Sequence, residues 1–209
     1  MYEELKERLK QIEIDYNGKV FRDIINQVKK DKVNDDELLG LIEKTSRKRF
    51  GENVSFTMNV NLGNLLETII TIAAVILAFQ TNSNWMLYFS ALILMTTLHP
   101  LSHYITGAFF GIRFTHYYLN GPARIEPTLR INQISYLKAS GGKRAFMHIT
   151  GVIGTLAAPL IAALIALDKG AVSTAWNLFY FFVLLIIFEL LTSTKIGDLM
   201  KAKREYGYR

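Results

Sequence analysis

The chain has 209 residues, half of them apolar, together with a formal net charge of +6, which is not the composition of an ordinary soluble domain. Residues 1–60 carry 12 Lys/Arg and 12 Asp/Glu, so the whole basic excess lies in the apolar residues 61–209, which argues against a nucleic-acid-binding protein with a solvated basic face. The absence of cysteine excludes disulfide frameworks, thiolate metal sites and cysteine nucleophiles.

Residues 1–60 are predicted to form a small helical cap in the cytoplasm. The first ten residues are charged throughout and lack the apolar run of a secretory signal. Apolar residues recur at steps of three and four over Leu5–Ile14 and Val20–Val28, a spacing that is typical of helices with one buried face. A third helix is expected to start with Asn34 or Asp35 as its N-cap.

Residues 61–209 are predicted to form a membrane domain with about four transmembrane helices. A helix needs about 20 residues to cross the ~30 Å of hydrocarbon in a bilayer, and the apolar stretches reach this length alone or with their flanks. The expected spans are residues 62–80, 85–111, 145–167 and 174–192, with residues 112–144 as a long loop. The expected fold class is therefore an all-α membrane protein, and the lipid bilayer is expected to surround its apolar helices.

Basic residues predict the orientation, because Lys and Arg accumulate in cytoplasmic loops. The loop 112–144 contains six of them and the tail from Lys195 contains five, whereas the two loops expected on the other side contain none and one. Both termini are therefore expected to be cytoplasmic. Short apolar alternations from Ile112 onward predict extended segments in the same loop, so the helical fold gains a small β-containing cytoplasmic element.

A pair of histidines, His99 and His103, lies one helical turn apart in the second predicted span. Positions i and i+4 share a helix face with Cβ atoms about 6 Å apart, so both imidazoles can bind a single metal ion. Continuing this row by fours reaches Gly107 and Gly111, a stripe of small residues that lets another helix approach closely. By itself, the pair is equally consistent with two imidazoles that only form hydrogen bonds between helices.

The histidine pair, in the motif His99-Pro-Leu-Ser-His103, is the first of several motifs that follow in order. The others are Asn120-Gly121-Pro122, the basic entry Lys143-Arg144 into a helix that contains Gly151 and Gly154, and Asp198 after the last span. In order and spacing, this set resembles the intramembrane zinc proteases of the site-2 protease type, over about residues 85–203. The resemblance implies a zinc ion held by His99, His103 and Asp198.

The departures from that family concern the catalytic base. Pro100 stands where the family has the glutamate of its HExxH motif, and proline can neither accept nor donate a proton. The asparagine and proline that normally precede the family's aspartate are also missing, and Lys195 places a cation there. We therefore expect a catalytically silent or regulatory homologue that keeps the metal site, and whether the chain is an enzyme stays open.

Two alternatives remain. The chain is an active intramembrane zinc metalloprotease that uses an unconventional base, for which Glu67 and Glu189 are the candidates, or it is a structural or transport-associated membrane protein without a metal. Glu189 is expected to be a poor base, because on one continuous helix it would lie about 13.5 Å along the axis from Asp198 and on the opposite face.

The other histidines, the glycine pair and the long loop are not predicted to be part of the metal site. His116 and His148 lack a partner at ligand spacing, although a polar contact from His148 to the site is an alternative. Gly141-Gly142 is expected to be a flexible turn into the third span. The loop 112–144 is expected either to anchor at lipid headgroups through Arg113, Tyr117 and Tyr118, or to bind a transmembrane or peptide partner at a strand edge, as the resemblance implies.

Overall fold

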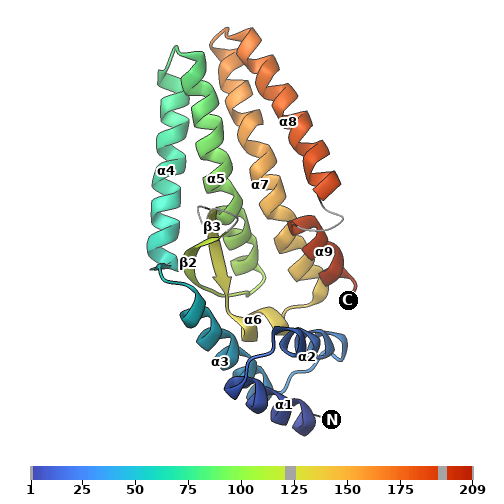
Figure 1. Ribbon diagram of the computed structural model, residues 1–209. Coiled ribbons are helices and arrows are strands. Elements are labelled where there is room, and N and C mark those ends of the chain that lie inside the picture. Colours follow the sequence, from blue (N-terminus) through green and yellow to red (C-terminus); the bar gives the residue numbers. More distant parts are fainter. Residues whose placement is uncertain (1, 121–125, 193–196, 209) are drawn as a thin grey trace.

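The computed structural model describes residues 2–120, 126–192 and 197–208. In this part of the chain the fold is mostly helical: four long apolar helices stand side by side, shorter helices gather at one end of them, and a small antiparallel sheet lies near that end (Figure 1). Both described ends of the chain lie at the end of the bundle that carries the short helices (Figure 1). The predicted fold class is confirmed.

Three helices form the N-terminal end of the molecule: α1 (Tyr2–Ile14), α2 (Gly18–Lys30) and α3 (Asp36–Asn53). Their apolar faces meet in one core of leucine, isoleucine and valine side chains, to which Leu137 from a later helix also contributes. Of the two predicted N-caps of α3, Asp35 is the one that acts, because its carboxylate accepts a hydrogen bond from the Leu38 backbone amide at 2.7 Å.

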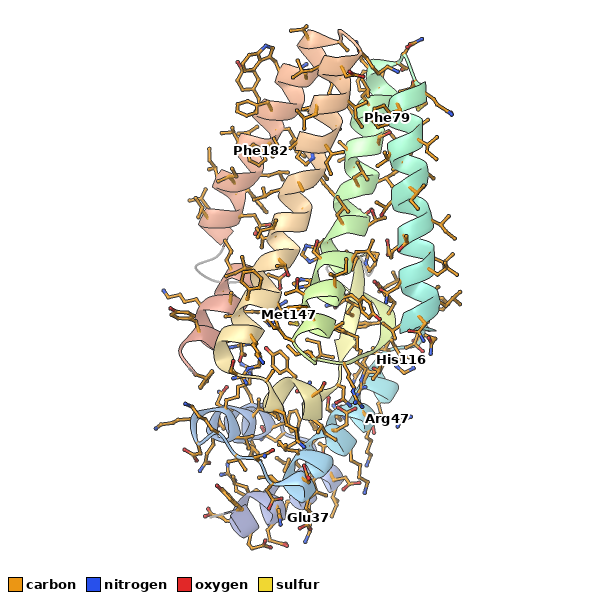
Figure 2. The ribbon with its side chains drawn as sticks, turned by 180° about the vertical axis from the view of Figure 1, so that it is seen from behind. Glu37, Arg47, Phe79, His116, Met147 and Phe182 are labelled. Carbon is orange, nitrogen blue, oxygen red and sulfur yellow. The ribbon has the colours of Figure 1, made fainter. Side chains whose placement is uncertain are left out.

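The four candidate membrane helices are α4 (Val60–Gln80), α5 (Asn84–Phe109), α7 (Gly141–Asp168) and α8 (Val172–Thr192). All four are long and apolar enough to cross a bilayer. Large apolar side chains such as Ile72, Phe79 and Leu184 are exposed on them, whereas nitrogen and oxygen atoms gather around the N-terminal helices (Figure 2). An apolar surface this wide is unusual for a soluble monomer and fits contact with lipid.

The second candidate span ends earlier than the sequence predicts. α5 ends at Phe109, and Gly111 lies in the following turn with a φ of +78°, a conformation that favours glycine. Gly111 therefore does not extend the small-residue stripe of the helix, as the sequence predicted, and serves the turn into the sheet instead.

The third candidate span begins earlier than the sequence predicts. Ser140 is the N-cap of α7, and the helix starts at Gly141, so the prediction of a flexible turn at Gly141-Gly142 is wrong. A Cβ atom at Gly141 would lie 2.5 Å from the backbone oxygen of Glu205. Glycine is needed there because the C-terminal helix passes directly against the first turn of α7.

The sheet contains the extended segments predicted in the loop. Strands β2 (Phe114–Asn120) and β3 (Glu126–Ile131) pair antiparallel, and β1 (Thr57–Asn59) pairs with the other side of β2, which gives the order β1-β2-β3. A short helix, α6 (Gln133–Lys138), then leads from β3 towards α7.

Tyr117 attaches this sheet to α4, the first candidate membrane helix. Its ring is buried against Gly63 of α4, where an added Cβ atom would lie 2.2 Å from the ring, and its hydroxyl donates a hydrogen bond to Asn64 Oδ1 at 2.8 Å. Burial raises the pKa of the Tyr117 hydroxyl above its ordinary value. The prediction that Tyr117 anchors at lipid headgroups is wrong.

Candidate metal centre

His99 and His103 of α5 meet Asp198 at a single carboxylate oxygen. Asp198 Oδ2 lies 3.2 Å from His99 Nε2 and 3.0 Å from His103 Nε2. One ligand atom from each of the three residues lies within 4.8 Å of the others, and Asp198 is only 8% exposed. The structure therefore brings together the three residues that the sequence predicted as metal ligands.

Asp198 reaches this position because the helix of the fourth candidate span does not continue as far as Asp198. α8 ends at Thr192, and Asp198 is the first residue of a separate helix, α9 (Asp198–Tyr206), which lies beside α7 (Figure 1). Gly197 directly before it has a φ of +95°, which glycine adopts without strain. Residues 193–196, which include Lys195, lie outside the described residues.

Two glycines of α7 allow the histidine-bearing face of α5 to approach closely. A Cβ atom at Gly151 would lie 2.2 Å from His103 Nε2, and one at Gly154 would lie 2.5 Å from the backbone oxygen of Leu98. On α5 itself, Gly107 leaves room for the Phe114 ring of β2, which an added Cβ atom would approach to 2.5 Å. The predicted close contact at this face is present, with both a helix and the sheet.

The other nitrogen of each imidazole is held by the protein. His103 Nδ1 lies 2.8 Å from the Met147 carbonyl oxygen, to which it donates. His99 Nδ1 lies 2.9 Å from Thr155 Oγ1, and because Thr155 donates its own hydroxyl proton to the Gly151 carbonyl, it accepts from His99. Both rings then carry a proton on Nδ1 and turn Nε2 towards Asp198, which is the usual arrangement of metal-ligating histidine.

These distances fit a small divalent cation. Zinc binds histidine nitrogen at about 2.0–2.1 Å and carboxylate oxygen at about 2.0–2.2 Å, so neighbouring tetrahedral ligands lie ~3.3 Å apart. The observed histidine-to-carboxylate separations of 3.0 and 3.2 Å are close to this value, and all three ligand atoms lie within 4.8 Å of one another. Three lone-pair atoms this close repel one another unless a cation or protons lie between them, and the donor set of two imidazoles and one carboxylate suits zinc.

The carboxylate itself is ionised and partly neutralised. Burial raises the pKa of Asp198, but the histidine rings outweigh this effect when the nitrogens that face the carboxylate carry protons, and they then hold its pKa below the ordinary range. Lys201, one turn further along α9, donates to Asp198 Oδ1 at 2.8 Å. Because Lys201 takes Oδ1, the oxygen that faces His99 and His103 is left for a metal ion.

The three residues line a cavity of about 410 Å³ that also contacts Pro100, Glu126 and Glu189. Pro100 is buried within α5 and offers no ionisable group at the base position. The prediction that Glu189 points to the opposite face is wrong, because α8 and α9 are separate helices and Glu189 lines the same cavity. Glu67 of α4 is not among the lining residues in the part of the chain that the structure describes.

His148 is the site residue that sequence analysis undervalued. It lies on α7, is 6% exposed, and places Nδ1 3.6 Å from Asp198 Oδ1. The signal for it was present in the sequence, since His148, Gly151 and Thr155 recur at steps of three and four and share the face of α7 that meets His99 and His103. His116 lies on β2 opposite Arg130 and outside the cavity lining.

No protein-family model, no curated protein and no solved structure matches the chain. The resemblance to the site-2 protease type therefore stays a prediction.

Proposed function

We propose that the chain is a multi-pass membrane protein that holds a zinc ion at His99, His103 and Asp198, in an arrangement like that of site-2 proteases, and that it binds membrane partners without cleaving them. One observation carries the proposal: two Nε2 atoms converge on one carboxylate oxygen, at 3.2 and 3.0 Å, while the opposite nitrogen of each ring is held by the protein. Histidines that only cross-link helices do not need this shared orientation.

Pro100 occupies the position where a catalytic glutamate would act, and the absence of that glutamate favours binding of a partner over hydrolysis of its peptide bonds. A bound zinc ion supplies Lewis-acid polarisation of an oxygen ligand. Peptide hydrolysis also needs a group that moves a proton to the leaving amine, and a positioned acid or base contributes about 10²- to 10⁴-fold. Pro100 follows His99 in the buried helix, where a glutamate would have to act, and its ring carries no exchangeable proton.

The partner surface in this proposal is β3. Among the described strands, in the order β1-β2-β3, β3 pairs with β2 on one side only, and Glu126, Thr128 and Leu129 line the cavity that holds the metal ligands. An extended segment of a membrane partner can add to such an edge through backbone hydrogen bonds. We further propose that this end of the bundle, which carries the basic loop and both described ends of the chain, faces the cytoplasm.

A second candidate function rests on Glu189. Of the two candidate bases from the sequence, Glu189 is the one that lines the metal cavity, and if it acts as the base the chain is an active intramembrane metalloprotease. In that case cleavage of a transmembrane reporter would depend on Glu189 as well as on the three metal ligands.

The test combines metal content with cleavage. Full-length protein in lipid nanodiscs is expected to carry one zinc ion per chain, and His99→Ala is expected to lose it, while His116→Ala, a substitution outside the site, keeps it. A transmembrane reporter is expected to remain intact with the wild type. Zinc-free wild type would overturn the metal site, and cleavage that disappears in Glu189→Gln would establish the protease instead.

A further inference from the structure

The buried His148 ring presents a nitrogen to the site without a hydrogen-bond partner. Its Nε2 lies 3.0 Å from the Tyr136 hydroxyl, whereas Nδ1 has no hydrogen-bond partner among the described residues. Nδ1 lies 3.6 Å from Asp198 Oδ1, which is beyond hydrogen-bond length, and this oxygen already accepts from Lys201. Buried polar atoms are nearly always satisfied, so an unsatisfied one that faces a cluster of ligands calls for an occupant.

We propose that His148 is a fourth ligand of the metal ion and binds through Nδ1, so that three imidazoles and one carboxylate close the coordination shell. This inference rests on the proposed metal site. It rests equally on a pattern shared by the three rings, each of which has one nitrogen held by a protein oxygen and the other turned towards Asp198. The Tyr136 hydroxyl orients the His148 ring in the way that Thr155 orients His99 and the Met147 carbonyl orients His103.

The spacing of the rings agrees with a common centre. The ring centroids of His99 and His103 are 4.8 Å apart, and those of His103 and His148 are 5.9 Å apart. With zinc–nitrogen bonds of about 2.0–2.1 Å, two imidazoles of a tetrahedral site have centroids ~5.2 Å apart. The two observed separations lie on either side of this value, and the His103–His148 separation exceeds it by ~0.7 Å.

Tyr136 is itself fixed, so it can orient His148. Its ring is buried on α6, with the Lys29 ammonium 5.1 Å and the Arg144 guanidinium 5.5 Å from its centroid. Both cations pair with the fully buried Glu205 of α9, at 2.5 and 2.7 Å. The partner that holds the His148 ring is therefore part of the packed junction between the N-terminal helices, α6, α7 and α9.

A closed shell changes what the metal does. Structural zinc sites use four protein ligands, whereas catalytic sites keep one position open. With ligands from α5, α7 and α9, a four-coordinate ion would lock the C-terminal helix onto the bundle and leave no position for a substrate oxygen. The closed coordination shell is thus a second reason, independent of Pro100, for the site to bind a partner without cleaving it.

Cobalt in place of zinc tests the ligand count directly. Co²⁺ added to the full-length metal-free protein in nanodiscs reports coordination number through its visible absorption, and X-ray absorption counts the bound imidazoles. We expect a four-coordinate ion with three imidazoles in the wild type. His148→Ala is expected to bind cobalt more weakly by at least ~10-fold, with two imidazoles and water in the vacated position. Tyr136→Phe is expected to keep three imidazoles with weaker binding.

The outcomes separate this inference from the metal site itself. Two imidazoles in the wild type, with metal lost in His99→Ala, would leave the site intact and overturn the role of His148. No cobalt binding in the wild type would overturn the site and the inference together. Because the wild-type imidazole count decides the question alone, the test stands even if His148→Ala does not fold. His116→Ala serves as the control histidine and is expected to match the wild type.

Discussion

Replacing Gly151 by alanine is expected to abolish tight metal binding by displacing a ligand rather than deleting one. A Cβ atom at this position would lie 2.2 Å from His103 Nε2 and 2.4 Å from Cε1. Carbon atoms in ordinary contact are about 3.5–4.0 Å apart, so the imidazole must shift by more than ~1 Å. It is not free to do so, because its Nδ1 is bonded to the Met147 carbonyl at 2.8 Å.

The magnitude follows from this overlap. Overpacking of this kind costs about 1–3 kcal/mol of unfolding free energy, and displacing a ligand from its orientation is expected to weaken zinc binding by at least ~10- to 100-fold. Competition with a chromophoric chelator measures the affinity, and unfolding of the metal-free protein in nanodiscs, followed by intrinsic fluorescence, measures the stability.

Gly142→Ala is the matched control on the same helix. An added Cβ atom at Gly142 meets nothing within 4 Å, so this substitution is expected to leave zinc affinity unchanged and to stabilise the protein by about 0.4–1 kcal/mol, because alanine restricts the unfolded chain. If Gly151→Ala bound zinc as tightly as Gly142→Ala, the position assigned to the His103 ring at the metal centre would be wrong.

Three further changes test other parts of the account. Glu205→Gln is expected to destabilise the chain by about 3–5 kcal/mol in chemical unfolding, because Lys29 and Arg144 stay buried without their counter-charge. Burial raises the pKa of Glu205, but Lys29 and Arg144 outweigh it and hold the pKa below its ordinary value. Because this pKa is lower in the folded state, the ionised Glu205 stabilises the protein at pH values above its ordinary pKa of about 4.3, and this contribution is lost as the pH falls through the lowered pKa. Glu205→Gln should therefore reduce the dependence of the unfolding free energy on pH in the acid range. An unchanged dependence would contradict this. Pro100→Glu alone is expected to leave a transmembrane reporter intact. Pro100→Glu combined with His148→Ala is expected to cleave it, because the pair of changes restores both a base and an open position on the metal ion. Equal cleavage by the two variants would count against the closed coordination shell.

The histidine pair was predictable because it depends only on local geometry. His99 and His103 lie four residues apart on an apolar helix, and no tertiary contact is needed to place them on one face. The four spans were predictable for a similar reason, since length and hydropathy are properties of the segment alone.

Features that depend on distant contacts were not predictable in this way. The break between α8 and α9 has no proline to mark it, and it moved Glu189 from the expected opposite face into the cavity lining. β1 consists of three residues that pair with β2, whose partner residues lie about sixty positions later in the chain. His148 is a lone histidine in sequence, and its role becomes visible only when α7 lies against α5 and α9.

The zinc affinity of Asp198→Asn compared with the wild type tests the central claim most directly. Asparagine keeps the size of the side chain and removes the charge that faces His99 and His103, so the packing of α9 is largely retained. The account predicts that the wild type holds one zinc ion per chain and that Asp198→Asn loses it in competition with a chelator that the wild type withstands. Equal zinc affinity in the two proteins would contradict the assignment of Asp198 as a ligand and with it the proposed metal centre.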